Sequence, residues 1–161
     1  MAMDMFIKIT DIDGESDDKS HAKEIDVLAW SWGLSNSGSA HVGGGAGAGK
    51  VNVQDISFTK YIDKSSTILM MGCAKGTHYD EALLTVRKAG DTPLEYLKIK
   101  LEEVLITSLS TGGSGGEDRL TENVTLNFAK FYVTYQAQNK KGAKEGGEVF
   151  AKYDVAANAP I

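Results

Sequence analysis

The sequence predicts a mainly β protein, an antiparallel β-barrel or sandwich with one short helix packed at its side. Apolar residues recur at every second position along most of the chain, and only one segment has helical spacing. In the four longest runs the apolar positions also change parity partway, which indicates strands that bend around a closed barrel. The 161 residues, of which 42% are hydrophobic, are expected to form one domain over residues 1–161.

Seven strands are expected from the runs of period two. They span residues 3–9, 25–34, 51–62, 82–86, 96–107, 122–135 and 149–153, and the last of them closes the domain before a short tail. Where the parity changes, the apolar set would move to the opposite face unless the strand bulges. We therefore expect bulges near residues 28–29, 54–55 and 102–103 and near Lys130.

The single helix is predicted over residues 66–75. Ser65 or Ser66 can cap its N-terminus, and Gly76 suits the left-handed conformation that often follows a helix. Its buried face is expected to contain the apolar side chains at three- and four-residue spacing, namely Ile68, Leu69, Met71 and Cys73. Cys73 is the only cysteine in the chain, so no intrachain disulfide can form, and a buried inert thiol is the simplest interpretation.

Composition and charge argue against several classes of function. The net charge of −5 and the pI near 5.2 disfavour a basic surface for nucleic acid or for an anionic membrane. No run approaches the roughly 18 apolar residues of a membrane helix, and the N-terminus lacks the basic start and apolar run of a signal peptide. We expect a protein that starts in the cytoplasm and inserts in no membrane, and any export of it would have to proceed without a cleaved signal.

Two glycine-rich segments raise the alternative of a small nucleotide-binding or hydrolytic enzyme. Residues 44–50 nearly form a phosphate-binding loop, but Val51 replaces the required Ser or Thr, and the following residues alternate like a strand. Ser114 lies in a spacing typical of a hydrolase nucleophile, yet the next element is a predicted strand and all three histidines precede it. An interaction loop and a surface turn explain the two segments better.

No cofactor or metal site is predicted. The three histidines are not closely spaced, and one cysteine cannot supply a zinc cluster. The acidic residues 11–18 could suggest a calcium loop, but Ser16 and Ala22 stand where an EF-hand needs Gly and Glu. A solvated acidic loop is therefore expected, and no catalytic residue is assigned.

Six short blocks of the sequence give more specific information about the protein family than the composition does. They are MFIKI at 5–9, GES at 14–16, EIDVLAWSWG at 24–33, GKVNVQD at 49–55, FTKYIDKS at 58–65 and STGGSGGEDRLTENV at 110–124. In this order they closely resemble the haemolysin-coregulated proteins, the Hcp family of type VI secretion systems. The resemblance covers about residues 3–135, and residues 136–161 are less typical of the family.

The resemblance implies a β-barrel with a side helix, six copies of which form a ring. Rings of this family stack into the inner tube of the secretion system, and a contractile sheath drives that tube out of a Gram-negative cell. The resemblance also implies a spike protein at the tube tip and effector proteins carried in the ring lumen. The family has no catalytic residues to transfer, so no enzymatic activity is expected. The alternative is a phage-like tail-tube subunit, for which the same physical arguments hold.

Two sets of residues are candidates for contacts in such a ring. Residues 35–50 are expected to form a loop that touches a neighbouring subunit or the next ring, with contacts from Gly43, Gly44, Gly45, Gly47, Gly49 and Lys50. Ser31 lies between Trp30 and Trp32, whose rings are expected to fill the barrel core, so Ser31 would face the opposite, wet side and line the lumen. The alternative for Ser31 is a place on the outer wall or in an interface.

Overall fold

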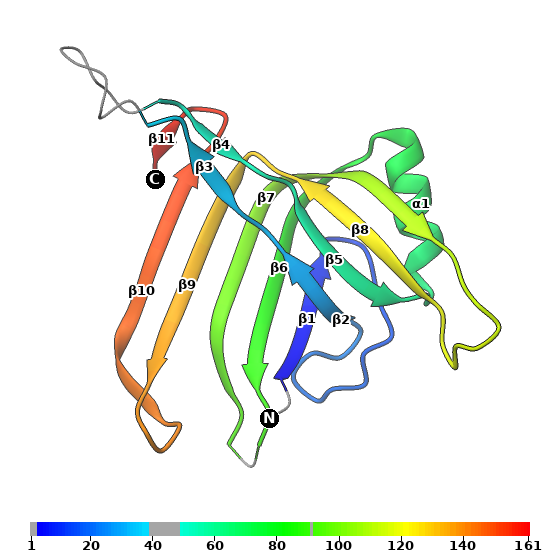
Figure 1. The fold of residues 1–161 in the computed structure, drawn as a ribbon, viewed down its shortest axis with the longest axis horizontal. Helices are drawn as coiled ribbons and strands as arrows, with labels where there is room; N and C mark the ends of the chain where they lie inside the picture. The colour runs from blue at the N-terminus through cyan, green and yellow to red at the C-terminus, as the bar shows by residue number, and fades with distance from the viewer. Residues whose placement is uncertain (1–2, 39–48, 91) are drawn as a thin grey trace.

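The computed structural model describes residues 3–38, 49–90 and 92–161, and these residues form eleven strands and one helix (Figure 1). In chain order the elements are β1 (Met3–Ile9), β2 (Ile25–Ser31), β3 (Leu34–Asn36), β4 (Val51–Val53), β5 (Ile56–Tyr61), α1 (Ser65–Lys75), β6 (His78–Lys88), β7 (Leu94–Thr111), β8 (Thr121–Asn127), β9 (Lys130–Gln138), β10 (Lys144–Asp154) and β11 (Ala159–Pro160). The mainly β class with one short helix is confirmed, although more strands are present than the seven expected.

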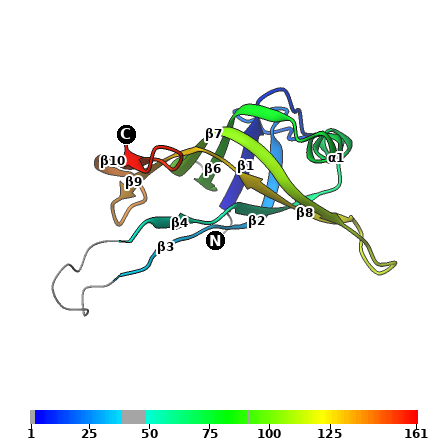
Figure 2. The ribbon, with the colours of Figure 1, turned by 90° about the horizontal axis from the view of Figure 1, so that it is seen from above.

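Six strands close into an antiparallel barrel. Their order is β7-β6-β1-β2-β5-β8, and β8 pairs back to β7, so every strand of the barrel has a hydrogen-bonded neighbour on both sides. The helix α1 packs against β7 at one end of the molecule (Figure 2). Aliphatic and aromatic side chains fill the interior, among them Ile7, Ile25, Phe58, Leu101 and Leu126. The barrel thus buries its apolar residues while it also pairs its strand edges.

β7 is long because one of its edges pairs with two strands. Its residues 97–102 pair with β9 and its residues 105–111 pair with β8. Between these segments Glu103 has a left-handed φ of 56°. Opposite it, the strand structure is interrupted at Phe128 and Ala129, which separate β8 from β9. β8 therefore belongs to the barrel, whereas β9 leaves it and extends the sheet with β10 and β11 (Figure 1). We call β9, β10 and β11 the flap.

The four predicted parity changes all coincide with irregularities, but only one of them is a simple bulge. In β2, Leu28 is an extra residue between two residues that pair with adjacent residues of β5, so the first predicted bulge is confirmed. Residues 54–55 separate β4 from β5, and Lys130 begins β9 after the strand break, so the bulges predicted there are wrong. At residues 102–103 the irregularity is the left-handed backbone of Glu103.

The helix lies close to its predicted position, but its N-terminal cap and its buried face differ from the prediction. Neither serine is the N-cap, because Lys64 holds that place without a side-chain hydrogen bond, and the Asp63 carboxylate accepts the Ser65 N–H at 2.9 Å instead. Gly76 has the expected left-handed φ of 66°. Leu69 is buried as predicted, whereas Ile68 and Met71 are 41% and 51% exposed. The helix is buried along a face that includes small residues, namely Ser65, Ser66, Leu69 and Gly72.

An arginine holds the loop between β1 and β2 against the barrel. The Arg87 guanidinium, on β6, donates to both carboxylate oxygens of Asp18 at 3.0 and 2.5 Å and to Asp4 on β1 at 3.0 Å. The hydrogen bonds from Arg87 lower the pKa of the Asp18 carboxyl from 3.8 to about 2. The ion pair therefore stabilises the fold at neutral pH and is lost only in strong acid.

Replacing Asp18 with asparagine should flatten the loss of stability in acid. Because the pKa of Asp18 is lowered in the folded protein, the unfolded chain binds a proton first, and stability falls as the pH drops from about 4 through about 2. Asp18→Asn should have a lower free energy of unfolding than the wild type at pH 5, and that free energy should decrease less than in the wild type between pH 5 and pH 2. Urea denaturation across this pH range measures both quantities. Asp17→Asn, which alters the adjacent exposed carboxylate, should keep the wild-type profile.

Candidate subunit interface and lumen wall

Two arms extend from the barrel on the same side, away from α1. One is the flap, and the other is the short antiparallel ladder of β3 and β4 (Figures 1 and 2). Gly49 and Lys50 lie immediately before β4, and the Asn36 side chain donates to the Gly49 carbonyl at 2.6 Å. The other four glycines of the predicted contact loop, Gly43, Gly44, Gly45 and Gly47, lie outside the described residues.

One face of the flap is apolar and uncovered. Residues that pair directly across two strands point to the same face of the sheet. Ile99, which is buried in the core, pairs with Val133, and Leu97 on the same face pairs with Tyr135, so this face of the flap continues the interior face of the barrel. These cross-strand rows continue onto β10, where Val149 pairs with Tyr135. Val149 is 61% exposed and Tyr135 is 44% exposed, although both share the face that the barrel interior uses. The flap therefore carries core-type side chains beyond the point where the barrel can cover them.

The outer edge of the flap also has free backbone groups. β11 pairs with β10 only at Tyr153 and Asp154, and the Ile161 N–H after it donates to the Lys152 carbonyl at 3.4 Å; in the part of the chain that the structure describes, no strand pairs with the outer edge of residues 144–151. An exposed edge of this length next to an apolar face is typical of a surface that another chain covers. We expect that chain to be a second copy.

The end of the molecule that carries α1 has exposed apolar side chains of its own. They come from α1 and from the nearby ends of β5 and β8, and they are Ile62, Ile68, Met70, Met71 and Leu120. This set differs from the flap and lies on the opposite end of the molecule (Figure 2). Two different exposed apolar surfaces at opposite ends allow head-to-tail contacts between copies. Such contacts close into a ring when the rotation from one subunit to the next adds up to a full turn.

A third surface is polar but carries no charge. On β2, β5, β8 and the C-terminal half of β7, the side chains that point out of the barrel form two cross-strand rows, Ser31–Ser57–Thr125–Ser108 and Ala29–Thr59–Asn123–Ser110. Hydroxyls and amides bond to one another along them, with Ser57 and Thr125 oxygens 3.1 Å apart and Thr59 donating to Asn123 at 2.7 Å. We call these eight residues the neutral wall.

The opposite wall of the barrel is charged. Side chains that point outward from β1, β6 and β7 include Asp4, Lys8, Arg87, Lys98 and Lys100. The two walls therefore differ in chemistry even though both belong to one closed barrel. Ser31 lies exposed at the end of the neutral wall, on the opposite side of β2 from Trp30, as the alternation predicted.

The two tryptophans contact the core but do not fill it. Both are half-buried, at the margin of the main apolar cluster. Trp32 packs edge-on against Phe131, with ring centroids 5.1 Å apart, and its indole N–H donates to the Gln54 carbonyl at 2.8 Å. Trp32 thereby joins the barrel to the base of the flap, where Phe131 begins the apolar face.

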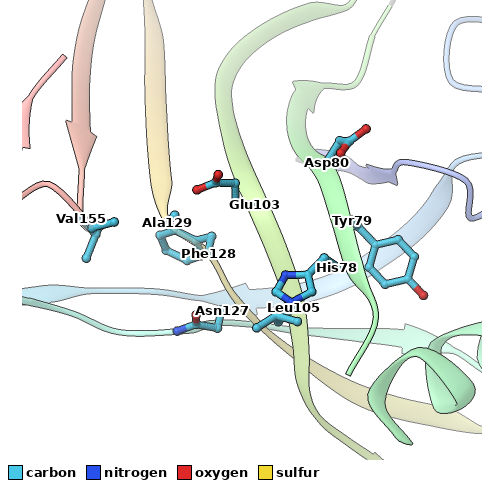
Figure 3. Close-up of a pocket in the computed structure, with 10 residues that line it drawn as sticks. His78, Tyr79, Asp80, Glu103, Leu105, Asn127, Phe128, Ala129 and Val155 are labelled. Carbon is cyan, nitrogen blue, oxygen red and sulfur yellow. The ribbon is translucent and has the colours of Figure 1, made fainter. Parts of the chain in front are cut away.

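A hollow near the middle of the molecule does not resemble a catalytic site. It measures about 700 Å³ and lies beside the break between β8 and β9, lined by His78, Tyr79, Asp80, Glu103, Leu105, Asn127, Phe128, Ala129, Val155 and Ala156 (Figure 3). Asp80 and Glu103 lie on different strands and point away from one another (Figure 3). Among the described residues, no hydrogen bond joins His78 to either carboxylate, and no group of acidic, His or Cys side chains could hold a metal.

The described residues of the two segments that raised the enzyme alternative have no catalytic geometry. Lys50 is exposed and precedes the strand β4, so the helix N-terminus of a phosphate-binding loop is replaced by a strand. Ser114 lies in an exposed turn between β7 and β8, and a strand follows it as well. Sequence reasoning had identified the two loops but missed the flap, because Tyr135 and Val149 alternate like core residues and only the fold shows that they are uncovered.

Comparison with known proteins gives a consistent result. Residues 6–135 match the family model described as type VI secretion system effector, Hcp. The chain is 67% identical over 159 residues to protein hcp1 of Pseudomonas aeruginosa, covering 98% of both chains. Among solved structures it is similar to Hcp1 of Salmonella typhimurium, with a TM-score of 0.84, 40% identity and full coverage of both chains. It is also similar to a type VI secretion effector of Yersinia pestis, with a TM-score of 0.77, 38% identity and coverage of 94% and 99%.

Proposed function

This chain belongs to the Hcp family of type VI secretion proteins, as a structural tube protein and not an enzyme, and we propose that it closes into homohexameric rings that stack. The observation that carries the proposal is the uncovered apolar face of the flap, with Val149 and Tyr135 at its centre. A second, different apolar surface around α1 supports contacts that run head to tail. Each subunit would use its flap on one neighbour and its α1 end on the other.

The mass and shape of the purified protein test this proposal. Light scattering should give six times the mass of one 17.2 kDa chain, and electron micrographs should show rings with a central hole. The mass should not change on dilution over a tenfold range if the ring is a stable assembly. A monomer at every concentration, with no rings in the micrographs, would contradict the proposal.

Further partners follow from membership of the family. The protein is secreted, and the structure shows no helix long and apolar enough to cross a membrane in the part of the chain that it describes. We propose that rings assemble in the cytoplasm, that the stacked tube lies inside a contractile sheath and carries a spike protein at its tip, and that it leaves the cell without a cleaved signal. Effector proteins would travel in the lumen.

Deleting residues 43–49 should leave the barrel folded and weaken the stacking of rings. The β3–β4 arm that carries this segment projects away from the barrel, so the deletion removes no core residue from the described structure (Figure 2). Thermal melting should show a folded protein, and electron micrographs should show single rings with few tubes. If tubes of normal length form, the glycine segment is only a linker.

We propose that the neutral wall lines the lumen, with Ser31 at its edge. Its small uncharged side chains leave room for a passenger protein and impose no fixed charge on it. The charged wall on β1, β6 and β7 would then face outward, toward the sheath.

Replacing Ser31 with arginine should abolish the carriage of effectors while leaving rings intact. Ser31 is exposed, so the change disturbs no core packing, but six copies would place six bulky cations around one lumen. Ser31→Thr, which keeps a small hydroxyl, should carry cargo as the wild type does. Effector recovered with purified rings measures the effect. Normal recovery with Ser31→Arg would place Ser31 outside the lumen.

A further inference from the structure

Three lysines gather at the tip of the flap. The turn between β9 and β10 contains Lys140 and Lys141, Lys144 begins β10, and all three are exposed. The turn has a defined shape, because the Asn139 side chain accepts the N–H groups of Lys141 at 2.8 Å and Ala143 at 3.1 Å. The cationic cluster therefore lies at a fixed place, next to the exposed edge and the apolar face of the flap.

A row of carboxylates lies at the other end of the molecule. In the segment after β1, exposed and buried residues alternate, and the exposed ones are all acidic: Asp11, Asp13, Glu15 and Asp17. Two backbone hydrogen bonds anchor the row, from the Gly14 N–H to the Lys23 carbonyl at 2.7 Å and from the Ser16 N–H to the Glu24 carbonyl at 3.0 Å. We call these four residues the acidic ridge.

The acidic ridge belongs to the same end as the exposed apolar side chains of α1. The Glu15 carboxylate accepts the N–H of Lys64, the N-cap of α1, at 2.7 Å, and the segment runs beside the helix end of the barrel (Figures 1 and 2). Each end of the molecule thus combines an apolar surface with a charged border. The borders have opposite signs.

We propose that the flap of one subunit covers the α1 end of the next, with the lysine turn of the first facing the acidic ridge of the second. This inference rests on the proposed ring and names the two surfaces that meet in it. A contact between two flaps would bring two lysine clusters together and leave the α1 end uncovered, whereas the head-to-tail contact pairs opposite charges and covers both apolar surfaces. Salt screens exposed charges over about 8–10 Å, so the preference acts only when the surfaces touch.

Reversing the charge of one border at a time tests the pairing. The flap variant carries Lys140→Glu, Lys141→Glu and Lys144→Glu, and the ridge variant carries Asp13→Lys and Asp17→Lys, so Glu15 keeps its hydrogen bond to α1. Alone, each variant should need at least about tenfold more protein than the wild type for half of it to assemble in 0.15 M salt. Mixed in equal amounts, the two should form rings, because in an alternating ring each wild-type lysine turn faces an unchanged acidic ridge, and each cluster of introduced glutamates faces a ridge with two introduced lysines and no net charge.

Native mass spectrometry gives the decisive reading, since the two variants differ in mass. The expected product is a ring with three copies of each variant. Wild-type protein that forms no ring would reject the proposed function itself. Wild-type rings together with unaffected single variants, or impaired variants that do not recover on mixing, would reject the pairing alone. Lys140→Gln, Lys141→Gln and Lys144→Gln in one chain serves as a milder flap variant, and unchanged assembly of it would also reject the pairing if the glutamate variant does not fold.

Discussion

Replacing Lys60 with methionine should lower the free energy of unfolding by about 3–5 kcal/mol. The Lys60 ammonium is fully buried, and it lies 2.5 Å from Glu122, 3.1 Å from Asp63 and 3.1 Å from the Ser66 hydroxyl. Removing the cation leaves two carboxylates with little access to water and without their counter-charge. The cost is therefore that of an unpaired buried charge, which exceeds the value of the methylene groups that methionine retains.

A double variant separates this explanation from a simple packing defect. Lys60→Met combined with Glu122→Leu removes both charges of the closest pair, and it should recover a large part of the lost stability. Lys8→Met on the exposed surface of β1 is the matched control and should change stability by less than about 0.5 kcal/mol. Urea denaturation at one fixed protein concentration compares all four proteins. A loss below about 1 kcal/mol for Lys60→Met would show that the network is solvated.

The sequence indicates that these two charged residues are buried, but it does not indicate that they pair with each other. Lys60 continues the parity of Ile56 and Phe58, and Glu122 that of Val124 and Leu126, so alternation alone places both charges on the core face. What the sequence could not show is the register that sets Lys60 opposite Glu122 across β5 and β8. That register depends on closure of the barrel, which brings together two residues 62 positions apart in the chain.

The same distinction separates the predictable part of the fold from the rest. Period two identified where most of the strands lie, although it merged neighbouring ones, and the parity change in β2 located the bulge at Leu28, because both signals are local. The flap was not predictable, because β9 has the same alternation whether a barrel or a second subunit covers it. The helix face was wrong for a similar reason: the apolar spacing included Ile68 and Met71, but close packing on β7 selected Gly72 and two serines. Surfaces made for another chain look like core in a single sequence.

Replacing Val149 with aspartate should convert rings into folded monomers. Val149 is exposed in one subunit, so the substitution breaks no contact on which the barrel depends. In the proposed ring, however, the apolar face of the flap is covered, and burying an unpaired carboxylate there costs several kcal/mol at each of six contacts. Assembly should weaken by at least about 100-fold, which corresponds to about 3 kcal/mol for each contact.

Light scattering and electron micrographs measure this loss of rings, and thermal melting checks that the monomer is still folded. Val149→Thr is the matched control, because it keeps the β-branched shape and adds a hydroxyl instead of a charge, so it should weaken assembly far less than Val149→Asp does. The comparison isolates desolvation of the carboxylate from any change in strand propensity. Rings of full mass formed by Val149→Asp at wild-type concentrations would mean that the flap face stays in water, and the contact between subunits would have to lie elsewhere.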